Sequence, residues 1–572
     1  MPYAITLDGE TYEDARNSFS WDVPDGFNAA TDLVGKHDGD RVGLYQVDDD
    51  GGHETYTFAD LDEQSNAVAN ALAARGIDRG DRVAVVVPQK PANLLTHLAC
   101  WKLAAVSIPL SVLFGDDALR YRLTDSEARV AVVDESQLAT IRAVAPDCPA
   151  LEYVLVVDGP DDSDVDSVDT AVVSRFESAV DWDETAFDVA ETDVDTPAVV
   201  MYTSGSTGKP KGVRHTHGVW LGHCPAVYMY FEHDVDEGVY WTPADWAWIG
   251  ALGDLVFPAW HYGRPVVGYP MGSFDPERSF ELMAEFDVTN AFVPPTAIRM
   301  LMGVDDPSDR YDLSLEAICS GGEPLTGEIL EWADDELEGV VVNELYGQTE
   351  ANLLVTNCRE WFPAKPGSMG KPVPGHDVAV LDPETGAAVE PGEIGQIAVR
   401  RDDDPVIFES YLNAPDKTAS VTLEDGPDGD DWHLTGDLAE RDDAEGTSAD
   451  PREPTGASRD EEGYYWFVSR DDDLIITSGY RVAPREVEET ILEHDAVEQV
   501  GVTGVPDETR GEIIKAVVQP ATGVTGTDGL REEIQKLVRD RLAKYEYPRE
   551  IEFRDELPTT TTGKIRRTEL GE

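Results

Sequence analysis

The chain has 572 residues, of which 41% are hydrophobic, so it can bury a large core and form two to four globular domains. Its 114 acidic residues outnumber 44 basic ones and give a formal net charge of −70. A surface of this sign argues against nucleic acid and anionic membranes as partners. The composition does not distinguish a monomer from a homodimer.

This charge opposes compaction through self-repulsion unless dissolved salt screens it. At molar ionic strength the Debye length falls to roughly 3 Å, so most of the repulsion disappears. The chain also contains only twelve lysines among its basic residues. We interpret the composition as halophilic, an adaptation to a very salty cytoplasm.

The expected location is the cytoplasm. The first 22 residues are polar and acidic, without the basic start and apolar core of a secretory signal. The apolar stretches are far shorter than a membrane span requires. The five cysteines are widely spaced and include no CxxC pair, which argues against a disulfide framework and a zinc site.

Helical and strand-like patterns alternate over the first 200 residues. Spaced apolar positions predict a helix over residues 61–75 that ends at Gly76. Continuous apolar runs predict buried strands over residues 82–88, 130–133 and 153–157. The alternation is typical of an α/β fold with a largely buried sheet. Residues 158–195, rich in Asp, Ser and Thr, are expected to form a long solvated connection.

From about residue 441 onward the sequence pattern changes, first to an acidic stretch and then to short periodic segments. An acidic stretch over residues 441–462 predicts a surface loop or disordered segment. Short periodic segments then predict a helix opened by Pro484, short strands over residues 500–505 and 513–518, and a helix with Leu530, Ile534 and Leu537 on one face. We therefore predict a boundary near Asp472, with an N-terminal domain over residues 1–472 and a C-terminal domain over 473–572.

The strongest local signal is a loop over residues 203–211, directly after the apolar run 198–202. Glycines let the backbone approach a phosphate, and hydroxyl and ammonium groups can bind its oxygens. The loop is not a Walker A motif, because its glycines are two residues apart and Pro210 follows the lysine. The candidate phosphate ligands are Thr203, Ser204, Gly205, Ser206, Thr207, Gly208, Lys209 and Lys211.

Two further segments follow strand-like runs. Residues 320–324 contain paired glycines, which would let a flat purine ring lie against the backbone, although such turns are also common structural features. Residues 343–350 bring together an aromatic ring, amide and hydroxyl donors, and a carboxylate suited to Mg²⁺. The structural alternative for this second segment is a helix start capped by Thr349.

Isolated charged residues mark the rest of the chain. Asp437 stands at the end of an apparent strand, and its carboxylate suits a ribose diol, although an ordinary turn would look the same. Arg470 stands out in an acidic neighbourhood, and Lys564 follows a glycine near the end of the sequence. Taken alone, Lys564 would be read as a solvated residue of the tail.

Together these motifs resemble the adenylate-forming superfamily, in particular AMP-forming acyl-CoA synthetases, from about Thr57 to the end of the chain. Residues 478–481, 545–549 and 551–553 are most similar to the branch that contains medium-chain acyl-CoA synthetases and acetyl-CoA synthetases. The resemblance implies a large, multi-lobed α/β N-terminal domain with αβαβα-type layers. It also implies a small, mobile C-terminal α+β domain.

The resemblance also implies roles for matching positions. Residues 203–211 would bind the β- and γ-phosphates, and Asp472 would be the hinge. The adenine, ribose and α-phosphate would be held by Gly322, Glu323, Pro324, Glu344, Tyr346, Gly347, Gln348, Thr349, Asp437, Arg470 and Arg481. Glu350 would hold Mg²⁺, and Lys564 would bridge the carboxylate and the α-phosphate as the main catalytic group beside Thr349 and Glu350. CoA would meet Ser478, Gly479, Tyr480, Arg510 and, less directly indicated, Arg539.

The implied reaction is the ATP-dependent ligation of a carboxylic acid to CoA. ATP converts the acid to an acyl-adenylate, with lysines and Mg²⁺ offsetting the repulsion between two anions. The CoA thiol then attacks the activated carbonyl. Rotation of the C-terminal domain about Asp472 would exchange Lys564 for the Gly479 segment between the two steps.

The acid is the least determined part of the reaction. Acetate-specific relatives have a tryptophan at the position of Gly347, so the glycine favours a longer acid, medium-chain or branched. Trp246 and Trp248 would either wall the acyl pocket or belong to the core. The alternatives are an aromatic acid, an acetate or propionate ligase, an enzyme that loads the acyl group onto a carrier protein, and a nucleotide-binding regulator without catalytic activity.

Overall fold

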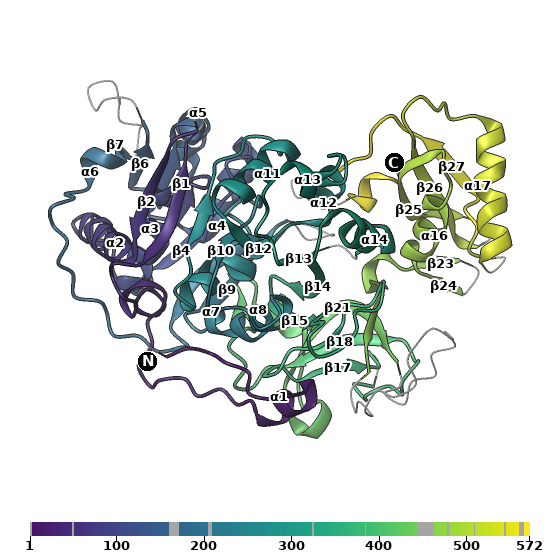
Figure 1. Ribbon diagram of the computed structural model, residues 1–572, viewed down its shortest axis with the longest axis horizontal. Helices are drawn as coiled ribbons and strands as arrows, with labels where there is room; N and C mark the ends of the chain where they lie inside the picture. Colours follow the sequence, from purple (N-terminus) through teal and green to yellow (C-terminus); the bar gives the residue numbers. More distant parts are fainter. Residues whose placement is uncertain are drawn as a thin grey trace.

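The computed structural model describes residues 3–48, 51–159, 171–203, 209–322, 325–383, 385–442, 463–477, 480–507, 510–542, 545–559 and 565–571. Two large β-sheets lie side by side in the N-terminal part, and two smaller sheets follow them towards the C-terminus (Figure 1). Among the helices of these ranges, none combines the length and apolar character needed to cross a membrane.

The first large sheet has the strand order β19-β9-β8-β4-β3-β5-β6-β7. Its strands are β3 (Arg82–Val86), β4 (Val106–Pro109), β5 (Val130–Asp134), β6 (Tyr153–Val157), β7 (Val172–Arg175), β8 (Pro197–Thr203), β9 (Lys211–Thr216) and β19 (Ser410–Tyr411). The strands from β8 to β7 are parallel, whereas β9 and β19 are antiparallel additions at one edge. The three predicted strands are therefore confirmed as β3, β5 and β6.

Two predictions for this region need adjustment. The predicted helix is α2 (Phe58–Ala73), which starts three residues early because Thr57 and Asp60 form a reciprocal capping box. Gly76 has a φ of 78°, as a glycine that ends a helix commonly does. The expected solvated connection is wrong in part, because it contains β7 and α6 (Phe176–Ala179), and β7 completes the sheet beside β6.

The second large sheet has the order β16-β15-β14-β13-β12-β10-β11-β1-β2. Its strands are β1 (Val42–Val47), β2 (His53–Thr57), β10 (Val239–Trp241), β11 (Val266–Gly268), β12 (Val288–Phe292), β13 (Ala317–Gly321), β14 (Val341–Gln348), β15 (Ala351–Thr356) and β16 (Lys371–Pro372). The antiparallel hairpin of β14 and β15 lies towards one edge, beside the parallel strand β13.

Helices cover both large sheets on both faces. They are α1 (Tyr12–Ser18), α3 (Pro91–Lys102), α4 (Asp116–Ser126), α5 (Leu138–Val144), α7 (Val219–Gly222), α8 (Cys224–Tyr230), α9 (Ile249–Ala251), α10 (Phe257–His261), α11 (Pro276–Glu285), α12 (Pro295–Leu301), α13 (Pro307–Arg310) and α14 (Gly327–Glu336), with π-helical turns η1 (Thr31–Gly35) and η5 (Leu252–Val256). One core joins α2, α3, α7, α8 and α10 to the facing sides of both sheets. Separate cores join α4 and α5 to the first sheet, and α11, α12 and α14 to the second. The expected αβαβα layering is thus confirmed.

The third sheet contains β17 (Val378–Leu381), β18 (Gly395–Arg400), β20 (Thr422–Leu423), β21 (Trp432–Arg441) and β22 (Tyr465–Arg470), with α15 (Pro415–Ser420) beside it. The single turn η7 (Asp471–Asp473) leads from β22 into the C-terminal unit, at the place where the boundary is predicted. Most of the acidic stretch over residues 441–462 lies outside the described residues.

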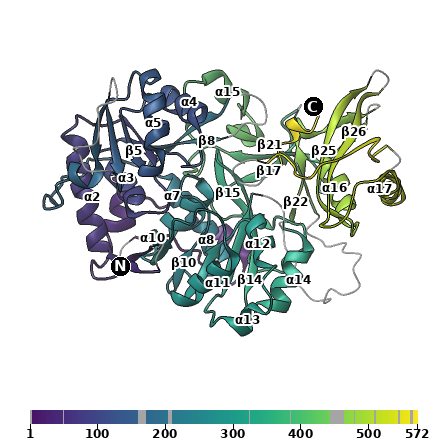
Figure 2. The same ribbon diagram turned by 90° about the horizontal axis from the view of Figure 1, so that it is seen from above.

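The C-terminal unit forms one end of the molecule in both views (Figures 1 and 2). It contains β23 (Ile475–Thr477), β24 (Tyr480–Val482), β25 (Val497–Asp507), β26 (Gly511–Pro520), β27 (Glu550–Phe553), α16 (Pro484–Leu492) and α17 (Asp528–Arg541). The two predicted short strands are in fact the long antiparallel pair β25 and β26. Val538, rather than the predicted Leu537, completes the buried face of α17 with Leu530 and Ile534.

Candidate active site

The loop predicted to bind phosphate, residues 203–211, connects two antiparallel neighbours, β8 and β9. Thr203 ends β8 and is the register partner of Lys211, which begins β9. The Lys211 ammonium lies 4.8 Å from the centre of the Tyr411 ring, and the Lys209 ammonium lies 5.4 Å from that of Tyr121. Tyr121 also donates a hydrogen bond of 2.9 Å to the carbonyl of Pro210. Residues 204–208 lie outside the described residues, so the structure fixes the base of the loop.

The segment that follows residues 340–342 is a strand and a turn. β14 runs through Tyr346 to Gln348, and Thr349 and Glu350 form the turn into β15. The alternative of a helix capped by Thr349 is therefore wrong. The strand alternation places Tyr346 and Gln348 on the same face, which directs both side chains towards β21.

The structure brings together four candidates for the nucleotide site, from three strands that are separated in the sequence. Asp437 on β21 and Arg470 on β22 are register partners, and the Arg470 Nε lies 4.0 Å from Asp437 Oδ1. The Tyr346 hydroxyl donates a 2.8 Å hydrogen bond to Asp437 Oδ2, and Gln348 Nε2 donates to the same oxygen at 3.3 Å. Burial and the neighbouring Asp437 charge hold the pKa of Tyr346 well above its usual value, so it remains a donor. A carboxylate oriented in this way can accept hydrogen bonds from two adjacent hydroxyls.

Glu350 is 8% exposed and is oriented by a residue that the sequence motifs did not reveal. The Tyr411 hydroxyl donates a 2.6 Å hydrogen bond to Glu350 Oε1. Tyr411 lies on β19, which pairs with β9, so the same ring meets both Lys211 and Glu350. Its strand is only two residues long, and such a strand has no recognisable pattern.

The backbone beside Glu350 is held by a neutral histidine. His215 Nε2 donates to the carbonyl of Thr349 at 2.7 Å. Burial lowers the pKa of His215 to about 4, so the ring stays uncharged at neutral pH. The described residues include no cluster of three or more His, Cys, Asp or Glu side chains that could hold a metal. A lone carboxylate beside a phosphate loop fits Mg²⁺, which prefers few carboxylates together with phosphate oxygens and water.

The paired glycines at the end of β13 have structural reasons of their own. Gly322 has a φ of 88°, and a Cβ on Gly321 would lie 2.3 Å from Leu345 Cδ1. Beside them, Glu344 Oε2 accepts a 3.1 Å hydrogen bond from the Leu325 amide. Burial raises the pKa of Glu344 to about 8, an upward shift that the Leu325 hydrogen bond and, less strongly, the charge of Arg485 in the C-terminal unit only partly oppose. Glu323 and Pro324 lie outside the described residues, and an adenine-binding role for this turn stays a prediction.

The two tryptophans proposed for the acyl pocket differ in their surroundings. Trp246 has no exposed surface and packs within the main core, where Gly268 leaves room for its ring. Trp248 is half-buried, and its ring lies edge-on to Phe114 at 5.9 Å. The environment of Trp246 is that of a core residue, and Trp248 stays a candidate for the pocket wall.

Gly347 lies against a neighbouring side chain. A Cβ at this position would lie 2.5 Å from the Asn352 Oδ1 atom. The side of the glycine that a larger residue would occupy is therefore already taken by a carboxamide. Sequence reasoning did not identify Asn352, because an asparagine near a strand start carries no motif.

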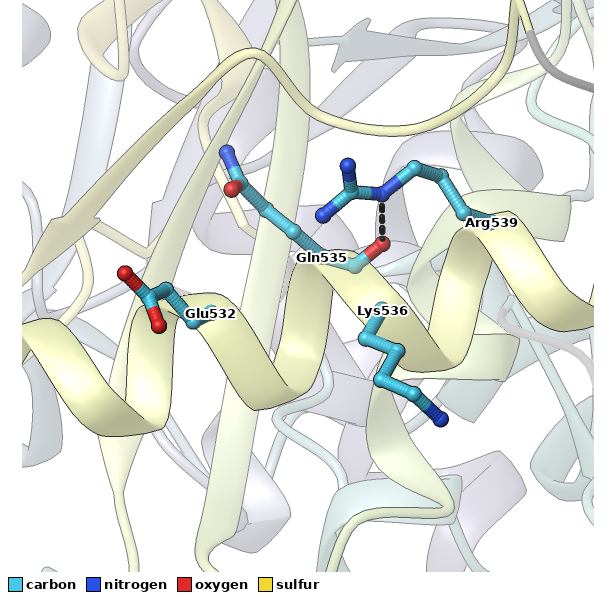
Figure 3. Close-up of a pocket in the computed structure, with 4 residues that line it drawn as sticks. All are labelled: Glu532, Gln535, Lys536 and Arg539. Atoms are coloured by element: carbon cyan, nitrogen blue, oxygen red, sulfur yellow. Dashed lines mark hydrogen bonds between the residues drawn. The ribbon is translucent and has the colours of Figure 1, made fainter.

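The candidate CoA residues are only partly described. Ser478, Gly479 and Lys564 lie outside the described residues, and for Asp472, Tyr480 and Arg481 the structure describes the backbone alone. The Arg510 amide donates to Asp507 Oδ1 at 2.9 Å, at the turn between β25 and β26. Arg539 lies on the exposed side of α17, in a hollow lined by Glu532, Gln535 and Lys536 (Figure 3). Its guanidinium donates to the Gln535 carbonyl and covers the Tyr547 ring at 4.9 Å.

Comparison with known proteins covers nearly the whole chain. Residues 33–412 match the family described as AMP-binding enzyme, and residues 486–564 match the AMP-binding enzyme C-terminal domain. The chain is 34% identical over 552 residues to the acetyl-coenzyme A synthetase of Bacillus subtilis, covering 95% of this chain and 90% of that protein. It is 33% identical over 581 residues to the mitochondrial acyl-coenzyme A synthetase ACSM3 of Rattus norvegicus, covering 99% and 94%.

Solved structures share the same architecture. The anthranilate CoA ligase AuaEII in complex with anthranoyl-AMP superposes with a TM-score of 0.80 at 26% identity, covering 96% of this chain and 97% of that one. A Brucella canis acyl-CoA synthetase superposes with a TM-score of 0.71 at 30% identity, covering 98% of both chains.

Proposed function

Because this chain belongs to the AMP-binding enzyme family and ligates a carboxylic acid to CoA through an acyl-adenylate, we propose that its acid is a medium-chain or branched one. The proposal is carried by Gly347, which has no side chain at a position where the resemblance implies a tryptophan in acetate-specific members of the family, although the Asn352 carboxamide occupies the Cβ side of this glycine. Trp248, half-buried near the first sheet, is the aromatic residue that we assign to the wall of the acyl pocket.

In the adenylation step, the chain has to bind two anions and stabilise a leaving pyrophosphate. Lys209 and Lys211 stand at the base of the phosphate loop and offset the charge of the β- and γ-phosphates. Tyr346 and Gln348 hold the Asp437 carboxylate so that it can accept both ribose hydroxyls. Thr349 and Lys564 meet the α-phosphate, and Lys564 orients the attacking carboxylate.

Magnesium is the metal that fits this site, with Glu350 as its protein ligand. When bound, it neutralises phosphate charge as pyrophosphate leaves. The protein orients Glu350 for this role through Tyr411, whose hydroxyl donates a hydrogen bond to one carboxylate oxygen.

For thioester formation we propose that the C-terminal unit turns about Asp472. Arg470, the last residue of β22, pairs with Asp437, and η7 follows immediately. The turn would bring residues 478–481 to the site in place of Lys564, and Arg510 and Arg539 would meet the phosphates of CoA.

We place the enzyme in a salt-rich cytoplasm, acting on small molecules and without nucleic acid as a partner. The net charge of −70 supports this proposal, because only concentrated salt screens such repulsion.

The test is acid-dependent release of pyrophosphate in molar KCl with MgATP, using carboxylates from acetate to decanoate, each with and without CoA. Turnover that requires CoA and is fastest for medium or branched acids supports the proposal. Preference for acetate or propionate would contradict the Gly347 argument, and release without need for CoA would favour transfer to a carrier protein. Lys564→Ala is the control, because it should abolish pyrophosphate release from every acid while leaving AMP binding in place.

A further inference from the structure

His433, the second residue of β21, is a buried histidine that the reaction described above does not use. It is 1% exposed, and its ring lies edge-on to that of Phe408 at a centroid distance of 5.2 Å. Burial lowers the pKa of His433 to about 3, so the ring is uncharged at neutral pH. A neutral imidazole carries its proton on one of its two nitrogens, and the neighbouring groups determine which one.

The neighbour of the His433 ring is the carboxamide of Gln348, the last residue of β14. Gln348 Nε2 lies 3.0 Å from the carbonyl oxygen of Thr435 and 3.3 Å from Asp437 Oδ2. Carbonyl and carboxylate oxygens accept hydrogen bonds, so the nitrogen of the carboxamide has to face them. The carboxamide oxygen then faces His433 Nε2 at 3.0 Å. The reversed amide would bring its oxygen against two other oxygens, so these contacts determine the orientation of the amide.

This orientation assigns the proton of His433 to Nε2. A carboxamide oxygen accepts hydrogen bonds, so the imidazole nitrogen that lies against it has to be the donor. His433 therefore donates to Gln348, and Gln348 donates in turn to Asp437. The histidine fixes the amide, and the amide helps to fix the carboxylate.

The backbone of β21 supports the same arrangement. Thr435 Oγ1 donates to the Ile397 carbonyl at 2.8 Å and accepts a hydrogen bond of 3.1 Å from the Asp437 amide. Gly436, between the two, has a φ of 76°, which glycine adopts without strain. His433, Thr435 and Asp437 thus reach the same carboxamide from one strand.

Burial alone would not distinguish His433 from a histidine of the core. His97 is an example of the latter, since it is 0% exposed and its ring contacts those of Trp101 and Phe257. Within the described part of the chain, neither nitrogen of His97 has a hydrogen-bond partner. His433 differs because its Nε2 contacts a side chain that itself contacts Asp437.

We propose that His433 is a positioning residue for ribose recognition, which acts on Asp437 through the orientation of Gln348. The inference rests on the proposed function, because it takes Asp437 to accept the ribose hydroxyls. It adds to that function a residue that acts without contacting the carboxylate itself.

Removal of the donor at His433 has one of two results. Either the Gln348 oxygen stays in place without its partner, or the amide rotates and turns this oxygen towards Asp437. The first result leaves a polar group unpaired, and the second replaces a hydrogen bond by repulsion between two oxygens. Both leave the carboxylate less well oriented. The bond lost is one between neutral groups, so we expect the affinity for AMP to fall about fivefold.

Calorimetric titrations of the full-length enzyme in molar KCl, with AMP and with 2′,3′-dideoxy-AMP, test this role. His433→Phe keeps an aromatic ring without a donor, so AMP should bind about fivefold more weakly and the dideoxy nucleotide within twofold of wild type. His433→Asn should behave in the same way, because its nitrogen is too close to the backbone to reach Gln348, and it serves if the phenylalanine variant does not fold. His433→Gln carries a nitrogen at about the reach of Nε2 and should keep most of the affinity.

Two further variants separate positioning from packing. In a Gln348→Met background, His433→Phe should have no further effect on AMP affinity, because the link to Asp437 is already broken. His97→Phe is the matched control, a buried histidine outside the site, and should leave both affinities unchanged. A purely structural role for His433 would weaken the binding of both nucleotides alike.

The outcomes distinguish this inference from the proposed function. If the wild-type enzyme binds both nucleotides equally well, Asp437 does not recognise the ribose and both fail. If the wild type discriminates but His433→Phe and His433→Asn bind AMP within twofold of it, the inference alone is overturned. Equal losses for the two nucleotides, or an undiminished effect of His433→Phe in the Gln348→Met background, would also overturn it.

Discussion

Removing the Tyr346 hydroxyl should weaken nucleotide binding through the ribose alone. In Tyr346→Phe the aromatic ring remains, so the proposed stacking on the adenine would be kept, but Asp437 loses its 2.8 Å hydrogen bond. Both residues are 9% exposed, so water does not readily replace the lost donor. A hydrogen bond to a charged group contributes about 1.5–3 kcal/mol.

Only part of this free energy should appear as lost affinity for AMP, because the hydrogen bond between Tyr346 and Asp437 also exists in the unliganded enzyme and is lost from both states. Gln348 still donates to Asp437 Oδ2, at the longer distance of 3.3 Å. We therefore take the lower end of the range, about 1.5 kcal/mol, which corresponds to a roughly tenfold weaker affinity for AMP. The pairing of Asp437 with Arg470 should keep the carboxylate near its present place.

Calorimetric titration with AMP and with 2′,3′-dideoxy-AMP measures this effect. The wild-type enzyme should bind the dideoxy nucleotide more weakly than AMP, and Tyr346→Phe should reduce that difference, since its carboxylate is less well oriented. Tyr411→Phe is a matched control, because it makes the same chemical change beside Glu350 and should leave AMP binding without metal unchanged. The reasoning is refuted if Tyr346→Phe binds AMP within twofold of wild type, or if the dideoxy penalty is undiminished.

Three other properties follow from the site and the surface. Tyr411→Phe removes the 2.6 Å hydrogen bond to Glu350. The Mg²⁺ concentration for half-maximal pyrophosphate release should therefore rise about tenfold. An unchanged midpoint in a MgCl₂ titration would contradict this prediction. The raised pKa of Glu344, about 8, means that its native state keeps a proton that the unfolded chain releases near pH 4.5. The contribution of Glu344 to the free energy of unfolding is therefore complete below about pH 4.5. It is lost as pH rises through about 8, at up to about 1.4 kcal/mol per pH unit. In denaturant titrations, the free energy of unfolding of the wild type should be lower at pH 8 than at pH 6. The decrease should be smaller in Glu344→Gln, and equal decreases in the two proteins would contradict the role of Glu344. The net charge of −70 predicts a melting temperature that rises between 0.1 M and 3 M KCl, and a melt independent of salt would exclude the halophilic interpretation.

The sequence predicts an α/β fold with a largely buried sheet well, because buried parallel strands are continuous apolar runs; the layered architecture is implied by the family resemblance. β3, β5 and β6 are each nearly all buried, so their positions follow from hydrophobicity alone. Hydrophobicity does not predict β7, because it is a short edge strand within a polar stretch and one of its valines, Val172, is exposed. The helix that begins at Pro484 is confirmed, since proline at the first turn is a local signal.

The motifs identify site residues, but their mutual contacts depend on tertiary pairing. The register between Asp437 and Arg470 joins residues on strands that a long acidic stretch separates. Tyr411 lacks any motif, because its importance arises from two strands that meet only in the folded sheet. Asp254 and Asn352 also belong to no recognisable sequence motif, because their burial and their hydrogen bond arise only when η5 packs against β15 in the folded protein.

The antiparallel edge of the first sheet has a consequence for how the chain is made. β19 near residue 410 must pair with β9 near residue 213 before Tyr411 can reach Lys211 and Glu350. Arg470 must emerge later still to pair with Asp437. At about 5–20 residues per second, a ribosome needs roughly 15 to 50 seconds to travel from the phosphate loop to Arg470. During that interval the nascent chain carries residues 203–211 without Arg470, so on the proposed assignment tight nucleotide binding would require the N-terminal domain to be completed.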